Sequence, residues 1–170
     1  MVQRGDDIST DLKVAEQLSD YEAVEVLWVA LVKAANRMLG ASEHQRMIGL
    51  VGRMPAASIK EVLHHPAVES LLSLDPPLET VLVDPSERLY PEDTKKALDQ
   101  IRSQRDKNGT QALLGLGEIL KRIRNKRAHG FKTRSGPRDR EILGAARPIL
   151  LRLCELAVEV VDSDNNFRAR

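Results

Sequence analysis

The sequence predicts an all-α protein, and three observations favour this fold class. Apolar residues recur at helical spacing in the strongly periodic segments, for example at Val24, Leu27 and Leu31. Aromatic residues make up only 3% of the chain, which argues against a β-sandwich and against aromatic platforms for single-stranded nucleic acid. Prolines surround the one segment that resembles a strand, residues 78–83. We therefore expect a bundle of five or six helices.

The length and composition of the chain limit the classes of protein to which it can belong. A chain of 170 residues with 42% hydrophobic and 30% charged residues is typical of one globular domain. We place this domain at residues 1–161 and expect a flexible polar tail at 162–170. Cys154 is the single cysteine, so neither an intramolecular disulfide nor a multi-cysteine zinc site can form. No signal peptide and no apolar run of about 20 residues is present, which predicts a cytoplasmic protein without membrane association.

The first predicted helix covers residues 12–39. Its apolar residues keep one helical face throughout, and Gly40 is a stop signal. Asp20 has the properties of an internal cap, so the segment forms either one long helix or two in series.

Short helices are expected next. Ser42 with Gln45, and Ser58 with Glu61, have the spacing of a capping box, in which side chains satisfy the unpaired amides of a helix start. Glycine and proline at positions 52 and 55 separate the two helices, and Pro66 opens a further turn.

Residues 75–91 are predicted to be a loop, with coil at 78–83, because prolines punctuate them every few residues. A helix resumes at Pro91 with acidic residues in its first turn, and the Asn108-Gly109 pair ends it. Two more helices follow, at residues 110–128 and from Pro137 to Val161.

Two smaller motifs are not expected to form a phosphate-binding or metal site. Gly115 and Gly117 lack the lysine, the third glycine and the preceding strand of a phosphate-binding loop, and close helix packing explains them better. His64 and His65 are adjacent, so their rings diverge on a helix, and no other ligand lies at a suitable spacing. We expect neither a metal site nor a cofactor.

Positive charge is concentrated in one segment. The chain carries a net charge of only +1, yet residues 121–140 hold nine basic residues against one acidic residue. Outside this segment, acidic residues outnumber basic ones. Such a segment is either a site for a polyanion or a solvated helix end and loop.

Within the basic segment, Arg124, Asn125 and His129 form a compact polar motif. Asn125 and His129 are four residues apart and share a helix face, and Arg124 lies beside Asn125 around the helix. Three polar groups can therefore converge at one helix end, just before Gly130. An asparagine and a histidine at this place can also simply satisfy helix carbonyls.

This motif resembles that of the HEPN domains (higher eukaryotes and prokaryotes nucleotide-binding). The family's motif is an arginine, a polar residue, a few variable residues and a histidine late in a helix, and Arg124-Asn125-Lys126-Arg127-Ala128-His129 matches it. The string from Ile123 to Phe131 is especially similar to the Apea-like branch. The resemblance covers residues 110–160, whereas residues 42–90 match nothing familiar. Arg122 also fits the looser spacing of the family, and Arg124 is preferred because an asparagine follows it.

The resemblance implies an HEPN-like helical bundle that forms a homodimer and acts as a metal-independent endoribonuclease, in some members a toxin or defence effector with an antitoxin partner. It gives Arg124, Asn125 and His129 catalytic roles in attack of the ribose 2′-hydroxyl on the neighbouring phosphate. Phe131 stands where some family toxins carry a modified tyrosine, so the resemblance does not imply that control route for this chain. Seven cations are expected to bind the RNA backbone: Lys121, Arg122, Lys126, Arg127, Lys132, Arg134 and Arg138. The alternatives are a non-catalytic HEPN-like module that binds RNA, nucleotide or protein, and a purely structural bundle.

Overall fold

The computed structural model describes residues 6–83, 88, 90–129 and 136–168. These residues form nine α-helices and no strand, which confirms the all-α fold class. The helices are α1 (Asp6–Glu16), α2 (Asp20–Ala35), α3 (Glu43–Val51), α4 (Ala56–Leu63), α5 (Pro66–Leu72), α6 (Leu78–Val81), α7 (Pro91–Gln104), α8 (Gly109–His129) and α9 (Pro137–Arg168).

The expected number of five or six helices is too low for the described part of the chain. Residues 12–39 fall into two helices, α1 and α2, and the cap of α2 is Ser19 rather than Asp20. The Ser19 hydroxyl accepts a hydrogen bond from the amide of Glu22 at 3.4 Å. The segment 78–83, expected to be coil, contains the single helical turn α6, which Pro77 precedes.

Helix starts were predicted well where a cap or a proline marks them. Ser42 is the cap of α3, and its hydroxyl accepts the amide of Gln45 at 3.1 Å. Prolines stand at the first positions of α5, α7 and α9. Ser58 is not a cap, because α4 already begins at Ala56, directly after Pro55.

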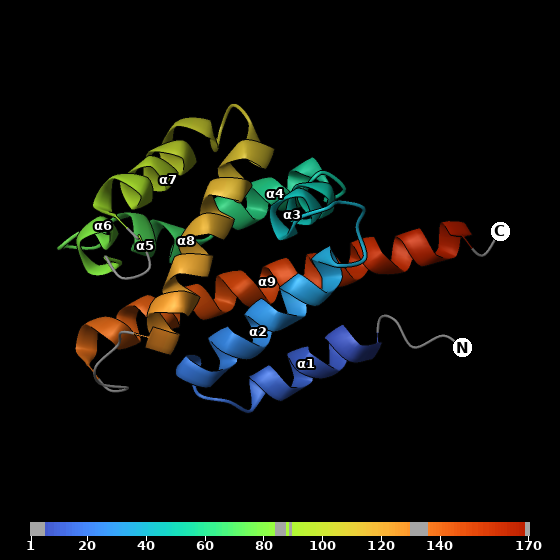
Figure 1. The fold of residues 1–170 in the computed structure, drawn as a ribbon, viewed down its shortest axis with the longest axis horizontal. Helices are drawn as coiled ribbons and strands as arrows, with labels where there is room; N and C mark the ends of the chain where they lie inside the picture. Colours follow the sequence, from blue (N-terminus) through green and yellow to red (C-terminus); the bar gives the residue numbers. More distant parts are fainter. Residues whose placement is uncertain (1–5, 84–87, 89, 130–135, 169–170) are drawn as a thin grey trace.

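Helix α9 is the longest of the described helices and extends along the whole length of the molecule. Figure 1 shows α2 alongside it and α1 beyond α2. Helix α8 crosses this layer, and α7 packs against α8 on the side away from α2. The start of α1 and the end of α9 lie at the same end of the molecule (Figure 1).

One hydrophobic core joins these helices. Helix α2 packs along α9 more extensively than any other described pair, because its apolar stripe faces the apolar stripe of α9. Leu116, Ile119, Leu120 and Ile123 of α8 are fully buried in the same core. Burial on this scale fixes the orientation of α8, and therefore the direction of each polar side chain on its surface.

Cys154 belongs to this core. Its thiol is buried on α9 and donates a hydrogen bond to the carbonyl oxygen of Leu27 on α2, at 3.1 Å. Burial raises the pKa of the thiol far above its ordinary value. The sulfhydryl is therefore protonated and acts as a small apolar group between the two helices.

The C-terminal helix is longer than the sequence pattern predicts. Helix α9 continues past Val161, its expected end, to Arg168. The flexibility of the polar segment 162–170 stays a prediction. Ser163 donates a hydrogen bond to the carbonyl oxygen of Glu159, and Asp164 forms an ion pair with Arg53, which lies between α3 and α4. The segment has no apolar stripe, so the sequence pattern ends at Val161 although the helix does not. Residues 169 and 170 lie outside the described residues.

None of the helices that the structure describes combines the length and the apolar composition needed to span a bilayer.

Candidate nucleic-acid interface

The polar motif lies on the last two turns of α8, the helix that the core orients. Asn108 starts the helix, since its side-chain oxygen accepts the amide of Gln111 at 3.2 Å. Gly115 lets α7 approach closely, because a Cβ at this position would lie 3.1 Å from the carbonyl oxygen of Ala97. This confirms the packing role expected for Gly115, whereas a Cβ at Gly117 would meet nothing within 4 Å.

Arg124 is held by a carboxylate from α2. Its Nε donates to Oε2 of Glu25 at 2.8 Å, and its Nη2 donates to Oε1 at 2.7 Å. This is the bidentate geometry in which the planar guanidinium matches a carboxylate best. The side chains of Arg124 and Glu25 are 31% and 27% exposed, so the pair is shielded from water over most of its surface.

Arg127 joins the same carboxylate and adds an aromatic contact. Its Nη1 lies 3.1 Å from Oε2 of Glu25, and its Nε donates to the carbonyl oxygen of Tyr21. The guanidinium carbon lies 4.3 Å from the centre of the Tyr21 ring, a cation–π distance. The Tyr21 hydroxyl in turn donates to the carbonyl oxygen of Arg127 at 3.3 Å. The start of α2 and the end of α8 are thus tied together.

The electrostatics of this cluster follow from its geometry. The hydrogen bond from Arg124 lowers the pKa of Glu25, partial burial opposes that shift, and the charges of Arg124 and Arg127 add to it. The pKa of Arg124 is raised, chiefly by its hydrogen bond to Glu25. These shifts favour the ionised forms of Glu25 and Arg124. With two guanidinium groups and one carboxylate, the cluster carries one net positive charge.

Asn125 is in contact with Arg124. Nη1 of Arg124 donates to Oδ1 of Asn125 at 3.2 Å. A guanidinium has five N–H bonds, and these contacts use three of them, which leaves one N–H on each terminal nitrogen of Arg124. His129 is the last residue of α8, one turn after Asn125, and its side chain lies outside the described part of the structure. The structure therefore brings two of the three motif side chains together.

The other predicted RNA-binding cations point in several directions around α8. Lys121 pairs with Glu43 of α3 at 3.2 Å. Arg122 donates to the buried hydroxyl of Thr94 on α7, at 2.8 Å. Lys126 donates to the carbonyl oxygen of Val83 at 3.0 Å.

Arg138 lies on α9 and holds the loop before α6, where it donates to the carbonyl oxygens of Asp75 and Pro76. Lys132 and Arg134 lie outside the described residues, as do Gly130 and Phe131. The described cations thus contact different parts of the chain, namely α2, α3, α7 and the segments on either side of α6.

No group of three or more histidine, cysteine or carboxylate side chains able to hold a metal ion occurs among the described residues. His64 lies 3.1 Å from the carboxylate of Asp106. His65 caps α5, where its Nδ1 accepts the amide of Ala67. Both histidines thus have local partners within the protein.

Sequence reasoning missed Glu25 and Tyr21. Glu25 is the only acidic residue in the apolar run from Ala23 to Ala35. A carboxylate inside such a run needs a partner when the helix packs, and this signal marks Glu25 as a residue to be paired. The sequence does not say which cation pairs with it, because Arg124 is 99 residues away.

No family model, no curated protein and no solved structure matches this chain.

Proposed function

We propose that this protein is an endoribonuclease of HEPN type that cuts RNA without a metal ion. The observation that carries the proposal is the anchored guanidinium of Arg124, which contacts Asn125 and retains two N–H bonds near the end of the helix that His129 completes. A fixed cation and a histidine on the same helix end are suitable residue types for attack of a 2′-hydroxyl on a phosphate.

The proposed chemistry needs only these groups and water. His129 takes the proton of the ribose 2′-hydroxyl while the oxygen forms a bond to phosphorus. The bond from phosphorus to the 5′-oxygen of the next nucleotide breaks, and that oxygen takes up a proton from water. The hydroxide that remains takes the proton back from the His129 imidazolium, which regenerates the base. The products are a 2′,3′-cyclic phosphate and a 5′-hydroxyl. The free N–H bonds of Arg124 stabilise the charge that grows on the phosphoryl oxygens.

Glu25 acts in this proposal as a positioning residue. It fixes the plane of the Arg124 guanidinium. Two of the guanidinium N–H bonds donate to Glu25 and are therefore not available to substrate. Fixing the donor before the reaction lowers the cost of orienting it in the transition state. Arg127 offsets the charge of the carboxylate, so the cluster keeps the positive charge that attracts a phosphate.

A homodimer completes the proposed site by bringing two motifs together across a twofold axis. Static light scattering then gives about twice the chain mass of 19.0 kDa. A clean monomer at tens of micromolar would remove the support for a composite site.

An antitoxin protein is a further proposed partner, and toxin or defence activity is the proposed role.

The test is cleavage of single-stranded RNA by the purified protein in EDTA. We expect 2′,3′-cyclic phosphate ends from the wild type. His129→Ala and Arg124→Ala each lose about 10²- to 10⁴-fold in rate, because one removes the proton acceptor and the other the charge partner. Arg138→Ala weakens RNA binding in a salt-dependent way and spares turnover at saturating RNA.

Arg152→Ala is the matched control, since it removes an arginine on α9 that pairs with Glu61 and Glu155. It should cleave RNA like the wild type. Retention of activity within about tenfold by folded His129→Ala would refute the catalytic proposal.

One observation favours a second function, a non-catalytic module that binds RNA, nucleotide or protein. Arg124, Arg127 and Lys121 already have carboxylate partners within the chain. Salt-sensitive RNA binding without turnover would support this function.

A further inference from the structure

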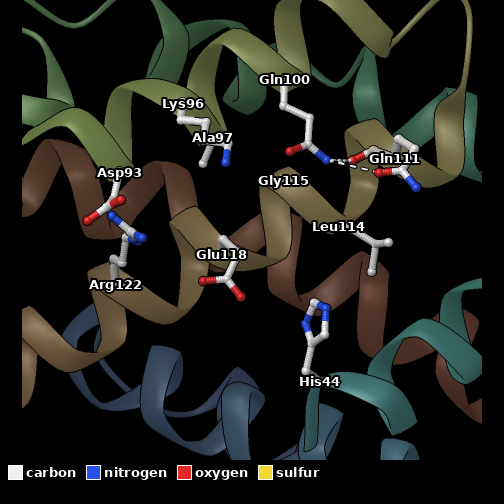
Figure 2. A pocket seen from close by; sticks show the side chains of 10 residues that line it. All are labelled: His44, Asp93, Lys96, Ala97, Gln100, Gln111, Leu114, Gly115, Glu118 and Arg122. Carbon is white, nitrogen blue, oxygen red and sulfur yellow. Dashed lines mark hydrogen bonds between the residues drawn. The ribbon is translucent and has the colours of Figure 1, made fainter.

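A second polar site lies on the opposite side of α8 from Glu25. A groove of about 390 Å³ is lined by α7, α8 and the start of α3. This volume is within the range of about 300–1,000 Å³ that is usual for small-molecule sites. Figure 2 shows its side chains, with α7 above, α8 across the middle and His44 of α3 below.

The polar side chains of the groove are available to a ligand. The side chains of Asp93, Lys96, Glu118 and His44 have no hydrogen bond or ion pair with any other described residue. Arg122 is different, because its Nη1 donates to the buried hydroxyl of Thr94 and the rest of its guanidinium keeps its donors. The groove therefore presents one anchored cation together with several unpaired polar groups.

The order of these groups along α8 gives the site a direction. Arg122, Glu118 and Leu114 are four residues apart, so each lies about 6 Å along the helix axis from the next. Gln111 lies about 16 Å from Arg122 along the same axis. The groove therefore runs from a cationic end through a carboxylate to an amide and apolar end.

The cationic end suits a single phosphate group. Arg122 and Lys96 provide two positive charges, and Asp93 lines the same end and reduces the net charge to one. An anchored guanidinium and an ammonium are the usual partners of a phosphate oxygen. The carboxylate of Asp93 disfavours the higher charge of a polyphosphate.

The middle and the far end suit a ribonucleoside. The carboxylate of Glu118 points into the centre of the groove in Figure 2, and a carboxylate is a common acceptor for ribose hydroxyls. Beyond it, Nε2 of Gln100 donates to the carbonyl oxygen and to Oε1 of Gln111, at 2.7 and 3.3 Å. This pair leaves one amide oxygen and one amide NH₂ for the edge of a base, with Leu114 and His44 beside them.

We propose that this groove binds a ribonucleoside monophosphate. The phosphate lies at Arg122 and Lys96, the ribose hydroxyls at Glu118, and the base at the Gln100–Gln111 pair. The site is separate from Arg124, which faces α2, so the proposal does not rest on the ribonuclease activity.

Calorimetric titration of the full chain with the four ribonucleoside 5′-monophosphates tests the proposal. We expect saturable binding of at least one of them, with inorganic phosphate more than tenfold weaker because it lacks the sugar and base. Lys96→Ala should raise the Kd about tenfold through loss of a charge-assisted hydrogen bond. Lys95→Ala is the matched control, since it changes the same charge on the adjacent position, where the lysine pairs with Asp99.

A second arm tests the sugar. The 2′-deoxy form of the best ligand should bind several-fold more weakly to the wild type, and Glu118→Ala should remove that difference. Arg152→Ala, which changes an arginine on α9 that does not line the groove, should bind the nucleotide like the wild type. Four outcomes overturn the proposal: no saturable binding at millimolar concentration, equal losses in Lys95→Ala and Lys96→Ala, equal affinity for ribose and deoxyribose, or loss of binding in folded Arg152→Ala.

Discussion

The two sides of α8 use charge in opposite ways. On the side toward α2, one carboxylate from Glu25 holds two arginines, and half of the N–H donors of these two guanidinium groups are committed within the chain. On the side toward α7, Asp93, Lys96 and Glu118 line a groove and pair with no other described residue. The same helix therefore carries one cluster that braces the fold and one that stands open to solvent.

This difference shows that a basic segment in a sequence has to be interpreted residue by residue. A run of cations in the sequence is not one surface in the structure, because a helix distributes consecutive residues about 100° apart. Arg124 and Arg127 face one neighbour, and Arg122 and Lys126 face others. Pairing within the chain decides which charges support folding and which remain for a ligand.

The largest expected effect comes from breaking the α2 side. Glu25→Ala leaves two part-buried arginines without their carboxylate, and we expect the free energy of unfolding to fall by about 2–3 kcal/mol. Urea denaturation followed by circular dichroism measures this loss. Glu22→Ala is the control, because Glu22 is exposed and, among the described residues, its side chain is hydrogen-bonded to Ser19 alone, so its loss should stay within about 0.5 kcal/mol. Equal losses in the two variants would show that the cluster does not brace the fold.

The same carboxylate gives the stability a defined pH dependence. The pKa of Glu25 is lower in the folded protein than in the unfolded chain, where it is about 4.3. Its contribution is therefore complete above about pH 4.3 and is lost as the pH falls through the folded value. The stability difference between wild type and Glu25→Ala should shrink across this range when denaturation is repeated at decreasing pH. A constant difference would contradict the pairing.

A smaller effect is expected from the α7 side, where packing rather than charge sets stability. Gly115→Leu places a side chain where α7 approaches, and we expect a loss of about 1–3 kcal/mol from overpacking. The same change should alter the groove, since Gly115 lines it. Thermal unfolding measures the first effect, and an unchanged melting temperature would show that α7 can move away at no cost.

The smallest expected effect lies two residues further along α8. A Cβ at Gly117 meets nothing within 4 Å, so Gly117→Ala gains helix propensity without a clash. We expect a stabilisation of about 0.5–1 kcal/mol in the same thermal assay. A loss of stability here would mean that Gly117 serves a purpose other than helix formation.

Local signals predicted the fold class and most helix starts. Ser42, Pro66, Pro91 and Pro137 each begin or cap a helix as expected, because their effect on the first turn is local. The signals failed beyond Val161, where α9 continues without an apolar stripe. Asp164 in this segment pairs with Arg53, which is 111 residues away and which no local pattern identifies as its partner.

The candidate site was predicted in part for the same reason. The spacing of Arg124 and Asn125 places them side by side on one helix, and the structure confirms their contact. Glu25, which fixes the orientation of Arg124, comes from a helix that only tertiary packing brings near. A pattern along one helix identifies side chains but not the partner that orients them.

The burial of Cys154 has a practical consequence for labelling. The chain has one native thiol, and α2 and α9 shield it in the folded protein. A cysteine introduced on the surface, for example by Lys95→Cys, would therefore react with a maleimide spin label or dye while Cys154 stays unmodified. Each copy of the protein would then carry one probe at one known position. Pulsed dipolar spectroscopy on such samples could measure the separation between two copies directly, without removing the native cysteine.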